Sequence, residues 1–130
     1  MRISNIRTST LAAFLALLAA DVIIKFGGFR RLHETVKRWP VAGKRTDDPE
    51  LIGTLCAAVD RAGRYYPKQA LCLQRSAVGT CLLRVEGVAA QMVIGCRKIP
   101  FKGHAWIEVN GRVVNDNPKV QSFYKVLDRC

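Results

Sequence analysis

The stretch that decides the fold reads His104-Ala-Trp-Ile-Glu-Val109, then Asn110-Gly111, then Arg112-Val-Val-Asn-Asp116. Apolar and polar residues alternate on both sides of Asn-Gly, the dipeptide most typical of a tight hairpin turn. Alternation of this kind indicates strands with one buried and one more polar face. The stretch therefore predicts an antiparallel hairpin, and the rest of the fold has to pack against it.

The register of the hairpin decides which side chains face one another. A three-residue loop over 109–111, with a bulge at its glycine, pairs Glu108 with Arg112 and His104 with Asp116. Opposite charges then face each other near the turn, and an imidazole faces a carboxylate. We predict this register because it satisfies both cross-strand pairs at once.

A tight two-residue loop is the alternative register. It pairs Val109 with Arg112 and turns Asp116 to the face of the sheet opposite His104, because a shift of one residue exchanges the two faces. In that register Asn115 shares the face of His104 and is the candidate partner of its ring.

The residues between 47 and 103 predict two helices and a further strand. Asp48 followed by Pro49 is a helix start signal, and the apolar periodicity then continues to about residue 63. A second periodic stretch covers 69–85, and the run 89–94 is rich enough in Val and Ile for a buried strand. The segment 118–130 should return as a short strand or helix. Helices followed by a small antiparallel sheet indicate an α+β fold.

The N-terminal part is basic and apolar. Arg2 and Arg7 precede an apolar run over 11–20, which resembles a signal peptide, but Leu18 would be a large residue at the cleavage motif. Apolar character resumes at 22–26, although Asp21 and Lys25 leave no uninterrupted run of about 20 residues that would span a bilayer. We therefore predict a helix that faces the core or a partner, with contact to a membrane surface as a weaker option.

A basic amphipathic helix is predicted over 29–39, because its apolar residues recur at helical spacing and Pro40 ends it. The organisation we predict has two parts. Residues 1–46 form an N-terminal helical segment, which belongs to the same unit and is a candidate docking surface for a partner. Residues 47–130 form the domain that carries the chemistry.

Charge and length bound the function classes. The chain has 130 residues, 49% of them hydrophobic, which suits one globular domain, and its net charge is +11 from 21 basic and 10 acidic residues. This balance favours encounter with acidic peptides, anionic membranes or nucleic acid. No pattern of interleaved aromatic and basic residues accompanies it, so nucleic acid is not expected as a partner.

The five cysteines are at positions 56, 72, 81, 96 and 130, an odd number with no Cys-x-x-Cys pair. This pattern favours neither a zinc site nor a disulfide framework and suggests a reduced, cytoplasmic protein. Most of these cysteines are predicted to be small core residues. Cys72 differs because it falls in the first turns of the 69–85 helix, where unpaired backbone N–H groups and the helix dipole stabilise a thiolate.

A nucleophilic cysteine also needs an imidazole to take its proton. The chain has two histidines. His33 lies in the basic amphipathic helix, where a surface role is expected, whereas His104 opens the hairpin opposite the predicted position of Asp116. Cys72, His104 and Asp116 are therefore the candidate catalytic triad, with Asp116 orienting the ring. The backbone N–H of Cys72 and the side chain of Gln69 are candidate oxyanion donors.

Four short segments resemble the lasso-peptide leader peptidases: Cys72-Leu-Gln-Arg-Ser76, Val93-Ile-Gly95, His104-Ala-Trp106 and Asn115-Asp116. The resemblance covers about residues 50–127, and His104 follows Cys72 by 32 residues and precedes Asp116 by 12, as in that family. It implies a transglutaminase-like, papain-related α+β fold. It also implies Cys72 as nucleophile, His104 as general base and acid, and Asp116 as orienting carboxylate, without a cofactor or metal.

The resemblance further implies partners. The substrate would be a ribosomally made lasso precursor peptide, and an ATP-dependent lasso cyclase would act on the product. Fused members of the family carry a leader-recognition domain ahead of the peptidase, and nothing in residues 1–46 resembles it. A separate leader-recognition protein is therefore expected, with the N-terminal helices as candidate docking surface.

Two other functions remain open from the sequence. The same triad serves an acyltransferase or transglutaminase-like enzyme if an amine takes the place of water. A non-catalytic basic module that binds a membrane or nucleic acid would use the charge alone.

Overall fold

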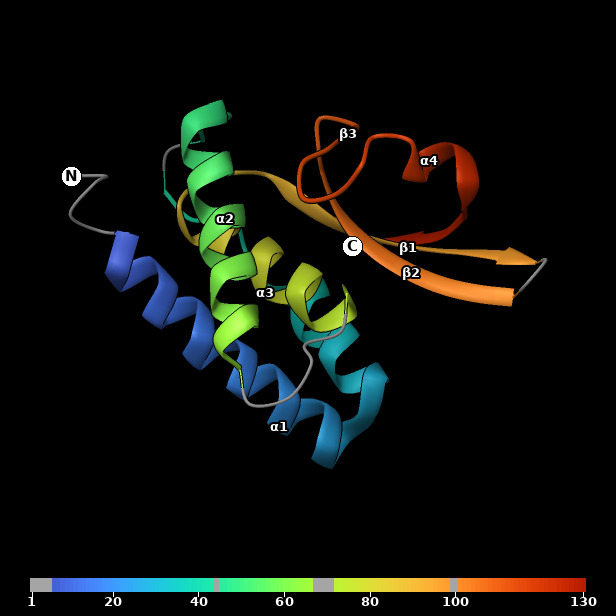
Figure 1. Ribbon diagram of the computed structural model, residues 1–130, viewed down its shortest axis with the longest axis horizontal. Coiled ribbons are helices and arrows are strands. Elements are labelled where there is room, and N and C mark those ends of the chain that lie inside the picture. The colour runs from blue at the N-terminus through green and yellow to red at the C-terminus, as the bar shows by residue number, and fades with distance from the viewer. Residues whose placement is uncertain (1–5, 44, 67–71, 99–100) are drawn as a thin grey trace.

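The computed structural model describes residues 6–43, 45–66, 72–98 and 101–130. Its elements follow one another as α1 (Ile6–Arg38), α2 (Pro49–Tyr65), α3 (Cys72–Val85), β1 (Ala90–Lys98), β2 (Phe101–Val109), β3 (Arg112–Val113), α4 (Val120–Phe123) and β4 (Lys125–Arg129) (Figure 1). Helices precede a four-stranded antiparallel sheet, so the predicted α+β class is confirmed.

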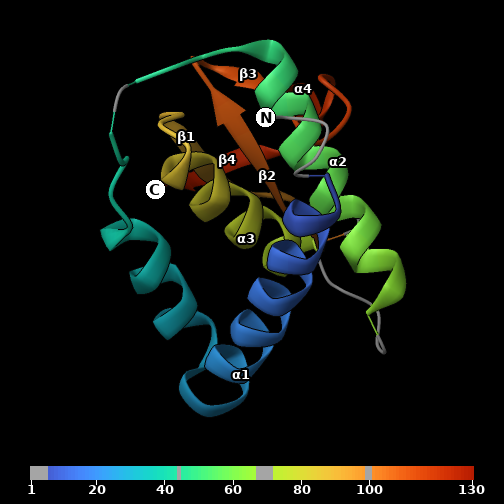
Figure 2. The ribbon, with the colours of Figure 1, turned by 90° about the vertical axis from the view of Figure 1, so that its left-hand side faces the viewer.

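Element α1 is a helical hairpin. Gly28 has φ 73° and ψ −178°, which breaks the helix between a long apolar limb and the predicted basic limb. This backbone conformation is one that glycine adopts at little cost. Figure 2 shows the two limbs diverging from the turn, which lies at the far end of the molecule from the sheet. By length and composition alone, Thr10–Arg38 of the described chain is sufficient to cross a membrane, and 17% of its most apolar window is buried.

Helix α2 begins as predicted. The Asp48 side chain accepts a hydrogen bond from the Glu50 N–H at 3.1 Å, and Pro49 occupies the first turn. Such a cap stabilises a helix by about 1 kcal/mol. Its buried face, which includes Leu55 and Val59, packs against α3.

The central element is α3, which packs against α1, α2 and the sheet. One cluster of buried residues joins both limbs of α1 to α2, α3 and β1; a second joins α2 and the end of α3 to β1 and β2. Since α1 contributes Ala13, Leu17 and Ala20 to the first cluster, residues 1–46 share the core of the rest of the chain in the part that is described.

The strands are ordered β3-β2-β1-β4. Ala105, Ile107 and Val109 of β2 are buried on the side of α2 and α3, whereas Trp106 belongs to a smaller cluster on the other face, with Val120 of α4. The alternation that was used to predict the strand thus separates two cores.

The predicted hairpin register is wrong. Val109 pairs with Arg112 and Glu108 with Val113, and Asn110 and Gly111 both have positive φ, 53° and 78°. This is the tight two-residue turn. The predicted Glu108–Arg112 pair does not form, because the Glu108 side chain is buried and binds Trp106 and Gln121.

A buried guanidinium joins three segments. Arg84, near the end of α3, donates from Nε to the Ala90 carbonyl at 2.9 Å and from Nη2 to the Cys130 carbonyl at 2.7 Å. Its Nη1 donates to the carbonyls of Val36 and Trp39 at the end of α1. Backbone carbonyl groups at the end of α1, at the start of β1 and just after β4 thus surround the charge.

Candidate active site

Cys72 is the first described residue of α3, and its side chain is half-buried. The predicted start of this helix at residue 69 and the candidate oxyanion side chain Gln69 lie outside the described residues. From Cys72 the helix leads one turn on to Ser76, which is fully buried and faces the hairpin.

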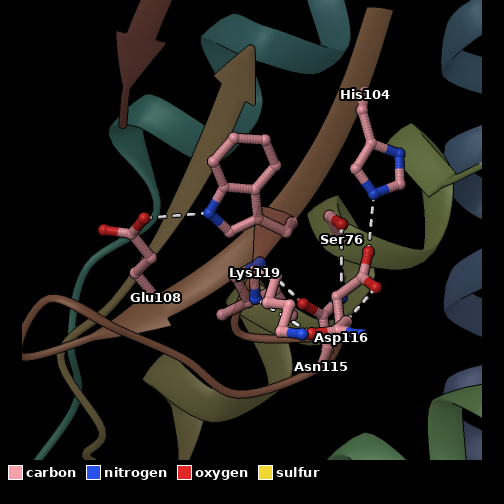
Figure 3. A network of polar contacts seen from close by, with 9 residues as sticks. Ser76, His104, Glu108, Asn115, Asp116 and Lys119 are labelled. Atoms are coloured by element: carbon pink, nitrogen blue, oxygen red, sulfur yellow. Dashed lines mark hydrogen bonds and ion pairs between the residues drawn. The ribbon is translucent and has the colours of Figure 1, made fainter. Parts of the chain in front are cut away.

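His104 and Asp116 are hydrogen-bonded, with Nε2 and Oδ2 2.5 Å apart (Figure 3). The His104 side chain is 20% exposed and that of Asp116 31%. A carboxylate bonded to one ring nitrogen fixes the orientation of an imidazole and stabilises its protonated form. The other nitrogen, Nδ1, is then the one available to a thiol.

This contact forms although the register that was expected to provide it is absent. Strand β3 ends at Val113, and the chain bends through the next three residues instead of continuing the ladder. Face alternation no longer applies past that point, so Asp116 reaches His104 from a bend beside the strand.

The bend is held by the side chain of Asn115. Its Oδ1 accepts a hydrogen bond from the Ile107 N–H at 2.8 Å, while the Val114 N–H donates to the Ile107 carbonyl at 3.0 Å. The Asn115 Nδ2 lies 3.4 Å from Ser76 Oγ on α3 (Figure 3). Asn115, the alternative partner predicted for His104, thus fastens the loop of Asp116 to β2 and to the helix of Cys72.

Two aromatic rings pack around His104. Tyr124 stacks on His104 with 5.1 Å between ring centroids, and the Trp106 ring lies 5.9 Å from that of His104. Opposite His104 in the ladder is Gly95, where a Cβ would come within 2.9 Å of Trp106 and 3.0 Å of Tyr124. Glycine at this position lets both rings lie across β1. No local pattern in the sequence pointed to Tyr124, which lies near the C-terminal end of the chain.

The buried carboxylate of Glu108 accepts a hydrogen bond from the Trp106 ring. Its Oε2 accepts a hydrogen bond from Trp106 Nε1 at 2.8 Å (Figure 3). The same oxygen accepts from Gln121 Nε2 at 2.9 Å, and Oε1 accepts from Arg129 Nε at 3.3 Å. Burial alone would raise the pKa of this carboxyl, but the three donors and the Arg129 charge outweigh burial and lower the pKa.

The candidate residues open into one cavity of about 430 Å³, whose lining includes Cys72, Ser76, His104 and Asp116. Charged side chains surround the triad there: Asp60 and Arg64 of α2 and Arg75 of α3. The structure therefore brings the three predicted residues to a common, solvent-open surface. A thiol, an imidazole and a carboxylate in one cavity can perform nucleophilic attack on a carbonyl, with proton transfer through the ring.

The other cysteines have different surroundings. All five are unpaired. Burial raises the pKa of the Cys56 thiol to about 11, with a further increase from nearby Asp60. Burial likewise raises the pKa of Cys81 to about 11, although Arg84 partly opposes the shift. Both thiols are protonated at neutral pH, as expected of small core residues.

The second histidine has a carboxylate partner of its own. His33 Nε2 lies 2.5 Å from Oδ2 of Asp128, which joins the basic limb of α1 to β4. Neither residue lines the cavity of Cys72. Within the described parts of the chain, no three His, Cys, Asp or Glu side chains gather in a way that could hold a metal ion.

A family model described as the transglutaminase-like superfamily matches residues 14–128. The match covers most of the chain, including helix α3 with Cys72 and strand β2 with His104. The chain therefore belongs to this superfamily. The fold implied by the family resemblance is thereby confirmed.

A region of 56 residues is 38% identical to the microcin J25-processing protein McjB of Escherichia coli. The region covers 43% of this chain and 27% of McjB, so the chain spans about a quarter of the length of the curated relative it matches. No solved structure matches the chain.

Proposed function

We propose that this protein is a cysteine peptidase that removes the leader from a lasso peptide precursor. One observation carries the proposal: the His104–Asp116 pair lines the same cavity as Cys72. The similarity to a protein that processes microcin J25 supports a role in lasso peptide processing. Membership of the transglutaminase-like superfamily supports acyl transfer through a thiol.

In the acylation step, His104 takes the proton of the Cys72 thiol through the ring nitrogen that does not face Asp116. The sulfur attacks the carbonyl carbon of the scissile peptide, forming the C–S bond and an oxyanion. When the oxyanion collapses, the C–N bond breaks and the imidazolium gives its proton to the departing amine. The core peptide leaves with a free N-terminus, and the leader remains as a thioester on Cys72.

In the deacylation step, His104 takes a proton from water as the water oxygen adds to the thioester carbonyl. The C–S bond then breaks, the leader leaves with a new carboxyl group, and the imidazolium returns its proton to the departing sulfur, which regenerates the Cys72 thiol. Asp116 stays ionised throughout and stabilises the imidazolium that forms in both steps. The free amine of the core peptide is the group that an ATP-dependent cyclase needs for ring closure.

The partners proposed for this reaction are a precursor peptide and a separate leader-recognition protein, both in the cytoplasm, where a ribosomal precursor is made. The cavity is open and mostly polar, and it holds little apolar surface with which to grip a long leader. Affinity supplied by a second protein would overcome this shortage by raising the local concentration of the scissile bond.

The test incubates a lasso precursor peptide with this protein, with and without a leader-recognition protein, and measures product masses. Wild type and Cys81→Ala should release leader and core, whereas Cys72→Ala and His104→Ala should release neither. Cleavage that survives Cys72→Ala and disappears in Cys81→Ala would overturn the choice of nucleophile. An amine added to the mixture separates hydrolysis from transfer: if most leader emerges with the amine attached at physiological pH, the enzyme is an acyltransferase.

A further inference from the structure

The apolar limb of α1 carries a stripe that nothing in the described chain covers. Leu11, Leu15, Leu18 and Val22 are each about half exposed, and Phe26 is 81% exposed. Their spacing of three or four residues puts them on one face of the helix. The core residues Ala13, Leu17 and Ala20 lie on the opposite face. This limb is therefore apolar on both sides, and protein covers only one of them.

The acidic residue of this limb turns away from the stripe. Asp21 accepts hydrogen bonds from Tyr66 Oη and Gln74 Nε2, both at 3.2 Å, and so faces α2 and α3. The charged side chain that remains exposed between residues 11 and 26 is Lys25. The outer surface of the limb thus combines large apolar groups with a positive charge.

The basic limb also exposes an aromatic side chain and several cations beyond the turn. Phe29 is half exposed, and Phe26 and Phe29 flank Gly27-Gly28 at the tip of the hairpin. Exposed cations follow at Arg30, Arg31, Lys37 and Arg38. Glu34 is the acidic residue of this limb, and Arg38 lies 3.5 Å from its carboxylate.

An apolar groove of about 140 Å³ opens between the two limbs and α3. Ala19 and Ile23 line it from one limb, Leu32 and Trp39 from the other, and Leu82 from α3. Ala19 is exposed and adjoins Leu18 and Val22 of the stripe, so the groove extends the same apolar surface.

We propose that the α1 hairpin docks on an anionic lipid bilayer. Leu15, Leu18 and Phe26 would enter the boundary between headgroups and acyl chains, while Arg30 and Arg31 contact anionic headgroups. An exposed apolar stripe beside cations, with aromatic residues at its edge, is the pattern of helices that lie in a membrane interface. The charge favours a lipid surface because the exposed part of the hairpin is uniformly cationic apart from the Arg38–Glu34 pair.

Docking along the surface also follows from how α1 is packed. A segment of this length and composition is sufficient to cross a membrane. Ala13, Leu17 and Ala20 are packed against the protein, however, and the chain reverses at Gly28. One face of the hairpin is therefore committed to the core, and the other is left for lipid.

The test is cosedimentation of the full chain with vesicles, either of phosphatidylcholine alone or of phosphatidylcholine mixed with phosphatidylglycerol. We expect at least roughly tenfold tighter binding to the anionic vesicles, and weaker binding as salt is raised from 0.1 to about 0.5 M. Replacing Arg30 and Arg31 by Gln should weaken binding to anionic vesicles by roughly thirtyfold. Replacing Leu15, Leu18 and Phe26 by Ser should weaken it by more than roughly tenfold.

A matched control comes from the opposite end of the fold. Phe123 and Leu127 are both 61% exposed, and their replacement by Ser should leave vesicle binding unchanged. Circular dichroism shows whether each variant is folded. Absence of binding to anionic vesicles at 0.1 M salt would overturn the proposal, as would unchanged binding by the folded stripe variant. The surface binds protein instead if two results occur together. The wild type does not bind vesicles, and the stripe variant is impaired in leader removal only when the recognition protein is present.

The outcome is independent of the proposed catalytic function. Leader removal by the wild type can be measured without vesicles, and vesicle binding can be measured with Cys72→Ala. A chain that binds vesicles but cleaves nothing refutes the peptidase and leaves the docking surface in place.

Discussion

The imidazole of His104 is bonded to the carboxylate of Asp116, and the two residues are not partners in any strand ladder. Their contact depends on a bend that follows β3, and the bend depends on the side chain of Asn115. The geometry of the site is thus set by side-chain hydrogen bonds at the open edge of β2.

Asp116→Asn should lower kcat for leader removal by roughly 10²–10⁴-fold, because an amide neither stabilises the imidazolium nor imposes the same tautomer. Product formation under saturating precursor measures the effect. Asp128→Asn is the matched control, since Asp128 pairs with His33 at the same 2.5 Å outside the cavity. If both variants lose the same activity, the Asp116 carboxylate has no special role.

Iodoacetamide at pH 7 should modify Cys72 well before Cys56 and Cys81. A thiol whose pKa is raised to about 11 has a thiolate fraction on the order of 10⁻⁴ at this pH. Peptide mapping at successive times measures the order of labelling. Raising the pH toward 10 should increase modification of Cys56 and Cys81, because their thiolate fraction rises as the pH approaches a pKa of about 11. Equal rates at pH 7 would argue against a reactive Cys72.

Gly95→Ala should lower kcat by more than its loss of folding stability alone would explain. The new methyl group would press on Trp106 and Tyr124, the two rings that pack around His104. We expect about 1–3 kcal/mol of destabilisation from overpacking, and a fall in kcat of up to about 10²-fold from misplacing His104. Denaturant melts and kinetics on the same preparation give both numbers. Gly103→Ala, where nothing lies within 4 Å of the added methyl, should change neither.

Stability should fall in acid, in part through Glu108. Its pKa is lowered in the folded protein, so its ionised form contributes stability that is fully present above the ordinary pKa of 4.5 and is lost as the pH falls through the folded value. Urea unfolding between pH 3 and 7 should show a shallower pH dependence for Glu108→Gln. Replacing the exposed Glu86 by Gln should leave the pH dependence of the unfolding free energy as in the wild type. If Glu108→Gln shows that same pH dependence, Glu108 does not contribute to the loss of stability in acid.

Local signals were enough to predict most of the fold. The Asp48 cap acts over a few residues and is found in the structure as predicted. The Asn-Gly dipeptide does form the turn of a hairpin, although in the two-residue register that was the alternative. Of the four apolar residues at helical spacing in the basic limb, Leu32 and Val36 are buried, whereas Phe29 and Trp39 are partly exposed. The α+β class followed because these elements leave few ways to bury their apolar faces.

Non-local contacts explain what the sequence did not predict. The three-residue register is wrong because Asn110-Gly111 forms the tight two-residue turn. Glu108 does not need Arg112 as a partner, since Gln121 and Arg129 from a later segment bind its carboxylate. Tyr124 reaches His104 through the return of β4 beside β1, which no local pattern announces. Cys72, His104 and Asp116 were found from residue type and spacing, and the catalytic roles given to them remain a prediction.

Arg84 couples local unfolding of the basic limb of α1 to unfolding of the sheet. Its guanidinium holds carbonyls of Val36 and Trp39 together with those of Ala90 and Cys130. Separating the basic limb of α1 from the core would strip partners from a buried charge, which is far more costly than exposing apolar surface alone. The amides of this limb should therefore exchange with solvent only when the sheet also opens. The N-terminal hairpin and the domain that follows would then be a single cooperative unit, and a cut near residue 46 would divide a unit and not a linker.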